Sequence, residues 1–80
     1  MQIFINNFIN NCKFNENDLQ VINQAHEVQD YNLMRVIIED NIDGIKNKID
    51  EELLCDKDVS EYLKTYKYLL KLENVIHEYL

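Results

Sequence analysis

The chain has 80 residues, the length of one domain with a single hydrophobic core. Its residues are 46% hydrophobic, with no proline and one glycine, so the composition is that of an ordered globular protein and excludes disordered and collagen-like classes. The formal net charge of -7 at pH 7 repels phosphate, so neither nucleic acid nor a membrane surface is expected as a direct partner.

Apolar residues recur at three- and four-residue spacing along the chain, which predicts helices rather than strands. The first helix is expected over residues 2–13. It carries two adjacent apolar rows, Phe4, Phe8 and Cys12 in one and Ile5 and Ile9 in the other. These rows predict a helix face that is either part of the core or an interface with another molecule.

A polar cluster at residues 15–18 ends the first helix and offers an N-cap for the second. The second helix is expected to bury a short stripe and to end in a break at residues 29–32. From Leu33 onward the pattern strengthens. The longest stripe of the chain follows at spacings of four, four, three, four and four: Met34, Ile38, Ile42, Ile45, Ile49 and Leu53.

The last helix is expected to open at Asp58, because Glu61 follows three residues later in the arrangement of a capping box. Its apolar face is wide and continues to the C-terminal residues. The two long helices, joined at residues 55–58, predict an antiparallel hairpin. The fold expected for residues 1–80 is therefore a single all-α domain, a small bundle of three or four helices built around this hairpin.

Five residues inside the third helix have the spacing of a cation-binding loop: Asn41, Asp43, Gly44, Asn47 and Asp50. With them, residues 39–50 resemble the twelve-residue calcium loop of EF-hands and dockerins. Two departures oppose that alternative, Glu39 at the first position and Lys46 at an apolar one. The isoleucine row also runs through the segment without a missed turn, which favours unbroken helix. Gly44 would then cost about 1 kcal/mol relative to Ala, offset by a close helix contact or a slight kink.

Metal and catalytic sites are not expected from the side chains present. Cys12, His26, Cys55 and His77 lie far apart and match no zinc-binding spacing. The only serine, Ser60, is better explained as a helix-start residue than as a nucleophile. We therefore expect neither an enzyme nor a bound cofactor.

Residues 19–38 have the length of a helix-turn-helix, which is a further alternative. The second helix of that motif would offer Arg35 as its only base, and Glu39 and Asp40 would close it. Phosphate contacts would be opposed by charge, so DNA binding is not favoured.

The start of the chain, residues 1–12, has no basic stretch and is interrupted by four asparagines, unlike a secretory signal peptide. No window reaches the roughly 18 apolar residues of a membrane span. Cys12 and Cys55 lack CxxC spacing and are expected to be reduced and at least half-buried. A soluble, cytoplasmic protein is expected.

Negative charge is concentrated in the middle of the chain, where residues 15–58 hold twelve acidic and four basic side chains. Such a patch steers a basic protein surface toward it, although a solvated helix face kept for solubility has the same pattern. The expected function is that of a small, acidic, non-enzymatic regulator or inhibitor that occupies a basic surface of a larger protein. In its most specific form the surface normally holds nucleic acid, and the chain is a DNA mimic. The carboxylates expected to bind are Glu39, Asp40, Asp43, Asp50, Glu51 and Glu52.

Tyr68 lies off the main stripe of the last helix and is expected to add a contact with the partner, because tyrosine is enriched at protein interfaces. The alternative function is a homo-oligomeric structural or assembly module, with a homodimer as its simplest form. Its self-association residues would be Phe4, Ile5, Phe8 and Ile9. Eleven asparagines and ten isoleucines against one alanine and one arginine are typical of an AT-rich coding sequence, which favours a low-GC bacterium, its phages or mobile elements, or an AT-rich virus.

Overall fold

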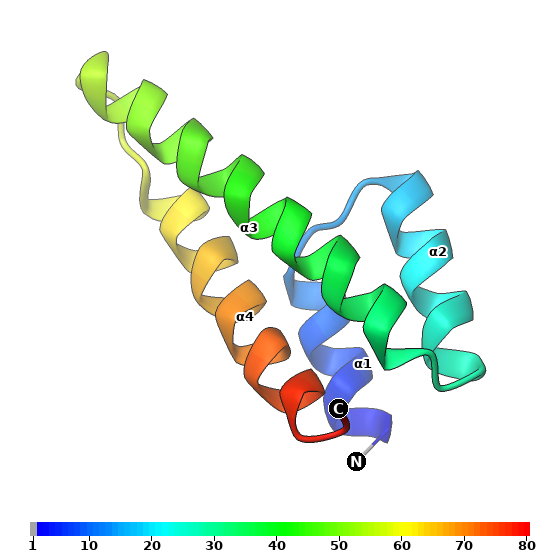
Figure 1. The fold of residues 1–80 in the computed structure, drawn as a ribbon. Coiled ribbons are helices and arrows are strands. Elements are labelled where there is room, and N and C mark those ends of the chain that lie inside the picture. The colour runs from blue at the N-terminus through cyan, green and yellow to red at the C-terminus, as the bar shows by residue number, and fades with distance from the viewer. Residues whose placement is uncertain (1) are drawn as a thin grey trace.

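The computed structural model describes residues 2–80, with side chains from residue 5 onward, and in that part of the chain it contains helices and no strand (Figure 1). The helices are α1 (Gln2–Asn11), α2 (Glu16–Glu27), α3 (Tyr31–Leu54) and α4 (Ser60–His77). The predicted all-α fold is confirmed. Among the described residues, no helix combines the length and the hydropathy that a membrane-spanning segment needs.

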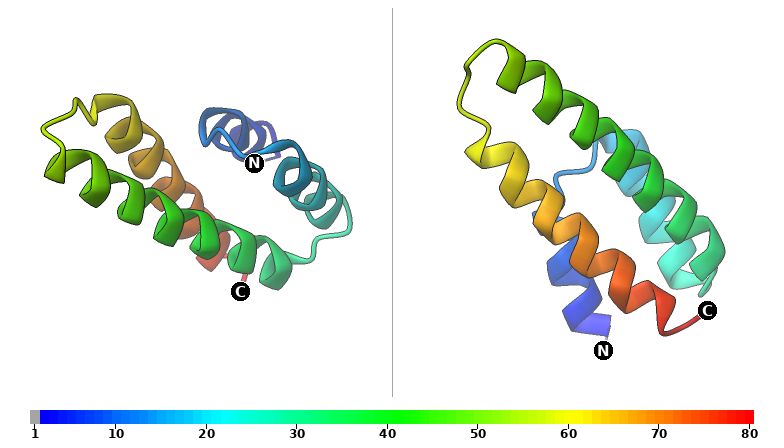
Figure 2. Two further views of the ribbon diagram at one scale, coloured as in Figure 1. Left: turned by 90° about the horizontal axis from the view of Figure 1, so that it is seen from above. Right: turned by 60° about the vertical axis from the view of Figure 1, so that its left-hand side comes forward.

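The hairpin of α3 and α4 is the main packing contact of the molecule. α1 packs against α4 and α2 packs against α3, so the two short helices form a second layer on one side of the hairpin (Figure 2). They cover only the part of the hairpin that is far from its turn, and the turn end projects beyond them (Figure 1). The molecule is therefore elongated, with extents of 42 × 20 × 20 Å.

One hydrophobic core joins all four helices. It consists of Ile5, Ile9, Cys12, Phe14, Ile22, Ala25, Met34, Ile37, Ile38, Ile42, Leu69, Leu72 and Ile76. The expected stripe of α3 is buried from Met34 to Ile42, where the second layer covers the hairpin. Further along, Ile49 is buried outside this core and Leu53 is exposed, because only two helices pack together there.

The beginnings of α2 and α3 are capped by side chains. Asn15 Oδ1 accepts a hydrogen bond from the Asp18 amide at 2.8 Å, so the predicted cap of the second helix is confirmed. Asp30 Oδ1 accepts from the Leu33 amide at 3.2 Å. This cap places the start of α3 inside the stretch that was expected to be a break.

The predicted capping box of the last helix is wrong. Asp58 Oδ1 accepts from the amide of Ser60 at 3.0 Å and from its hydroxyl at 2.6 Å, so α4 begins two residues later than expected. These bonds lower the pKa of Asp58. Glu61 does not reach back to the cap. It pairs with Lys13, after α1, at 3.1 Å, because the packing of α1 on α4 brings that ammonium group within reach.

Residues 39–50 lie within the unbroken helix α3, so the calcium-loop alternative is wrong and the helical interpretation is confirmed. The expected reason for Gly44 is not found. A Cβ atom built on Gly44 meets no atom within 4 Å outside the backbone of its own helix, so no close helix contact requires glycine there.

Candidate functional site

Five of the six carboxylates expected to bind a partner lie exposed along one side of α3, and we call them the acidic face: Glu39, Asp40, Asp43, Asp50 and Glu51. Glu39, Asp43 and Asp50, at spacings of four and seven, form one row. Asp40 and Glu51 are eleven residues apart, close to three full turns, and form a second row beside it. At a rise of 1.5 Å per residue the face extends over about 18 Å.

The acidic face keeps its charge free. Three ion pairs are present among the described residues, and they join Lys13 to Glu61 and both Lys48 and Lys57 to Glu52. None of them includes a carboxylate of the acidic face. Five negative charges are therefore available on one rigid helix to any cationic group that approaches from solvent.

Glu52 is different from the other five acids. Its side chain is only 15% exposed, and its two oxygens lie 3.4 Å from Lys48 Nζ and 3.5 Å from Lys57 Nζ. Its hydrogen bond, followed by its charge, raises the pKa of Lys48. Glu52 thus joins the last turns of α3 to the loop that follows, and the structure does not bring it to the acidic face.

Tyr68 is also separate from the acidic face. It lies on α4, half-buried, with its ring centroid 6.4 Å from that of Phe8 on α1. Lys71 Nζ is 5.5 Å from the centre of the same ring. Tyr68 therefore contributes to the contact between α1 and α4.

The apolar rows of α1 are part of the core. Ile5 and Ile9 are each 2% exposed, and Phe8 is half-buried against the core. The Phe4 side chain lies outside the described residues. Because α1 lays this face on α4, Ile5 and Ile9 offer no surface to a second copy in this fold.

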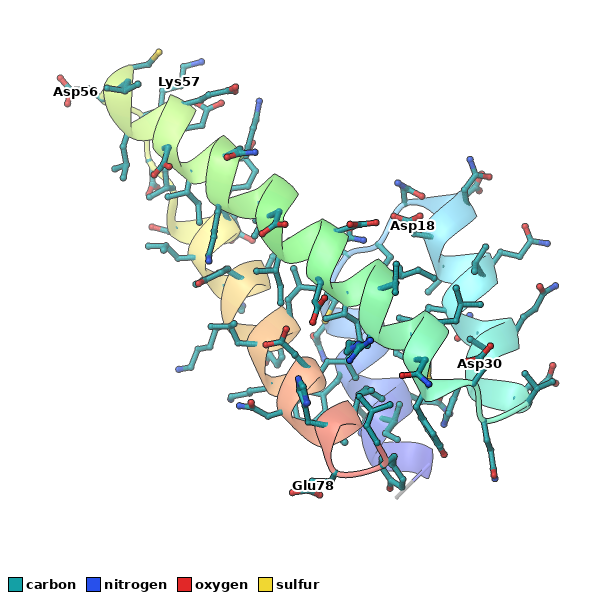
Figure 3. The ribbon with its side chains drawn as sticks, viewed as in Figure 1. Asp18, Asp30, Asp56, Lys57 and Glu78 are labelled. Carbon is teal, nitrogen blue, oxygen red and sulfur yellow. The ribbon has the colours of Figure 1, made fainter. Side chains whose placement is uncertain are left out.

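Three of the exposed large apolar residues of the described part lie at the turn of the hairpin, and the others are spread over the rest of the molecule: Val21, Val28, Leu33, Val36 and Leu80. We call residues 53–63 the hairpin tip, where Leu54 is 89% exposed and Leu53 and Leu63 are about half exposed. Asp56 and Lys57 lie at its end, away from the body of the molecule (Figure 3). Cys55, expected to be at least half-buried, is exposed there because the second layer does not extend to the turn.

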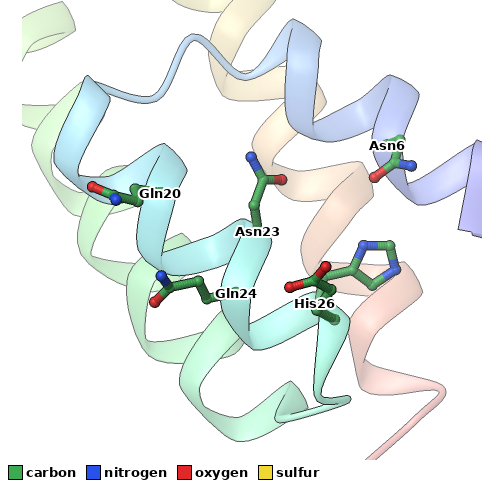
Figure 4. Close-up of a pocket in the computed structure, with 6 residues that line it drawn as sticks. Asn6, Gln20, Asn23, Gln24 and His26 are labelled. Atoms are coloured by element: carbon green, nitrogen blue, oxygen red, sulfur yellow. The ribbon is translucent and has the colours of Figure 1, made fainter.

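A polar groove of about 500 Å³ separates α1 from α2 (Figure 4). Four side-chain amides dominate its lining, with His26 and Glu27 beside them: Asn6, Gln20, Asn23 and Gln24. Amides donate and accept hydrogen bonds but do not transfer protons at neutral pH. The four amides of the groove therefore offer hydrogen bonding.

Cys12 lines a second depression, of about 390 Å³, where the loop after α1 meets α3 and α4. Charges of both signs surround it, so it selects no single class of ligand. Burial raises the pKa of the Cys12 thiol to about 12. The thiol is thus protonated at neutral pH and is a poor nucleophile.

The helix register brings together three residues that the sequence analysis did not connect, Glu39 of α3 and Glu73 and His77 of α4. One ligand atom from each lies within 4.8 Å of the other two. The four-residue spacing of Glu73 and His77 on one helix is a signal present in the sequence. The approach of Glu39 to these two residues has no such signal in the sequence, because it depends on how α3 and α4 are aligned.

Comparison of the chain with protein-family models, with curated proteins and with solved structures finds no match.

Proposed function

We propose that this chain is a small acidic regulator or inhibitor that binds a basic surface of a larger protein through the acidic face of α3. The observation that carries the proposal is the unpaired state of the five carboxylates on one side of a single helix. A face kept only for solubility has the same placement, because the other side of α3 is buried, so the capture experiment below separates the two functions.

The geometry suits recognition of a surface that binds nucleic acid. The carboxylates are arranged in two rows on an unbroken helix, so they present regularly spaced negative charge on a rigid support, as a phosphate backbone does. Charge complementarity of this kind speeds encounter and sets specificity. In this form the protein competes with nucleic acid for its target without binding nucleic acid itself.

The test is capture of the partner by matched charge variants. The double variant Asp40→Lys/Asp43→Lys reverses the middle of the acidic face. The double variant Glu27→Lys/Glu78→Lys makes the same change in net charge at exposed positions outside that face. Each tagged protein is mixed with lysate of a low-GC bacterium at about 0.1 M and about 0.5 M salt, because exposed charges are screened over a few ångströms at high ionic strength.

The expected result is one basic protein that the wild-type chain and the Glu27/Glu78 variant retain at low salt. The Asp40/Asp43 variant should lose it, and so should every chain at high salt. Displacement of the captured protein by added DNA would support the nucleic-acid-mimic form. Retention by the Asp40/Asp43 variant, with circular dichroism showing all chains folded, would overturn the proposal.

A second candidate function, self-assembly, is favoured by the hairpin tip. Leu53, Leu54 and Leu63 expose apolar surface at the end of the molecule that the second layer leaves uncovered. Burial of that surface against another copy would remove it from water. In this candidate the contact lies at the tip, not at α1 where the sequence analysis placed it.

A further inference from the structure

Glu39, Glu73 and His77 form a cluster of mixed donors on the surface between α3 and α4. Glu73 and His77 lie one turn apart on α4, and Glu39 faces them from the antiparallel helix α3. Glu39 and His77 are exposed and Glu73 is half-buried. Carboxylate and imidazole groups therefore converge at one point from two helices that the core holds in place.

The donor set favours a transition-metal ion over calcium or magnesium. Two carboxylate oxygens with one imidazole nitrogen suit Zn²⁺, whereas the hard cations prefer sites made of oxygen alone. Ligands of one zinc ion lie about 2.0–2.2 Å from it, so in tetrahedral geometry they lie about 3.3 to 3.6 Å from each other. Binding therefore requires side-chain rotations that bring donor atoms now up to 4.8 Å apart to that spacing.

The three donors are not committed to other contacts. Among the described residues, none of the three takes part in a side-chain hydrogen bond or an ion pair, and Arg35, one turn before Glu39, does not pair with it. A cation that enters therefore displaces water and no protein group. The charge of -7 adds a general attraction for cations.

We propose that Glu39, Glu73 and His77 bind one Zn²⁺ ion, with the fourth position left to water. Because the ion would join α3 to the last turn of α4, its binding would hold the C-terminal end of α4 against α3. Any ligand that binds only the folded state stabilises that state in proportion to the logarithm of its concentration. All three ligands come from one chain, and because Glu39 also belongs to the acidic face, zinc and a basic partner would compete for that carboxylate.

The test uses the whole chain, freed of metal by chelation, and ZnCl2 as the probe. Thermal unfolding is followed by circular dichroism, and binding by calorimetry. At ten times the Kd, we expect one equivalent of Zn²⁺ to be bound and the Tm to rise by roughly 6 to 11 °C for a domain of this size. Magnesium at the same concentration should leave the Tm unchanged.

Four variants locate the ion. His77→Ala and Glu39→Gln should each lower the affinity at least tenfold, and both residues are exposed, so the variants should fold. His26→Ala and Asp50→Asn change a histidine and a carboxylate outside the cluster and should keep the wild-type response. Cobalt absorption in the visible range gives a second readout, since an imidazole ligand changes its spectrum.

The proposal would be overturned by a wild-type chain that neither binds Zn²⁺ nor shifts its Tm. It would equally be overturned by a response that survives His77→Ala or disappears with Cys55→Ser. Loss of the response in Cys55→Ser would place the ion at the exposed thiol of the hairpin tip.

Discussion

The two cysteines have opposite chemical environments. Cys12 is buried in the core, where loss of solvation raises its thiol pKa to about 12, and Cys55 is exposed on the hairpin tip. The thiolate is the reactive form of cysteine. At neutral pH an alkylating reagent should therefore modify Cys55 and reach Cys12 only when the chain unfolds.

We expect the protonated state of Cys12 to make stability fall at alkaline pH. The unfolded thiol ionises near its ordinary pKa of 9.0, whereas the folded thiol holds its proton up to about 12. The folded state binds more protons in this window. The free energy of unfolding is therefore unaffected by this thiol below pH 9 and declines between pH 9 and 12.

Urea unfolding at pH 7 and at about pH 10.5 measures this effect. The wild-type chain should lose more stability between the two pH values than Cys12→Ala, which has no thiol at that position. Cys55→Ser should lose as much as the wild type. Equal losses in the wild type and Cys12→Ala would contradict the prediction, because titration of lysines and tyrosines is common to both chains.

The role of single acidic residues could be predicted from the sequence only in part. Exposure of Asp40 and Glu51 follows from their place opposite the isoleucine row of the same helix. Glu52 belongs to the same acidic run, yet it lies nearer the buried side and has two lysine partners. Lys57 reaches it only because the chain turns back after α3, and that turn geometry is not encoded in the spacing of residues within the helix.

At the scale of the helix, α3 carries a glycine where nothing in the packing requires one. We expect Gly44→Ala to stabilise the protein by about 1 kcal/mol, since alanine restricts the unfolded backbone and its methyl group meets no atom within 4 Å outside the backbone of its own helix. This corresponds to a rise in Tm of roughly 4 to 8 °C.

Differential scanning calorimetry measures the change. The matched control is Asn47→Gly, which introduces the opposite change at an exposed position of the same helix and should lower the Tm. An unchanged or lower Tm for Gly44→Ala would mean that the site is tighter than its geometry indicates.

At the ends of three helices, by contrast, positions whose backbone favours glycine carry other residues. Lys13, Gln29 and Asp56, which follow α1, α2 and α3, have φ values of 54°, 60° and 57°, in the left-handed region where glycine is favoured. The chain thus has its glycine inside a helix and none at these turns. Side chains at the three positions cost some stability, which the core must offset.

The helices themselves could be predicted because their apolar spacings are regular, and the stripes of α3 and α4 define the hairpin. The starts of α3 and α4 could not, since each depends on a local hydrogen bond. Asp58 was a plausible cap, but it bonds to Ser60 and so starts the helix later. The approach of Glu39 to His77 also depends on the alignment of two helices, which neither stripe determines alone.

At the scale of the whole molecule, the second layer leaves the hairpin tip without cover. If self-assembly uses this surface, the mass of the particle should depend on protein concentration, because association follows mass action. Light scattering at about 10 µM and about 500 µM would measure this. We expect Leu54→Asp to keep the chain monomeric at both concentrations.

The control for that experiment is Val28→Asp, which places the same charge on an exposed apolar residue far from the tip. It should associate as the wild type does. A wild-type chain that is monomeric at both concentrations would remove self-assembly as a function and would leave the tip as surface for a different protein.

The start of α1 and the end of α4 both lie away from the hairpin tip (Figures 1 and 2). The longest dimension is 42 Å, so a group fused at either terminus is held several nanometres from the tip. Immobilised by such a fusion, the protein would leave the exposed Leu54 of the tip accessible to solvent. The same architecture makes it a short rigid spacer, on which a grafted peptide in place of residues 55–59 would be displayed at a defined height.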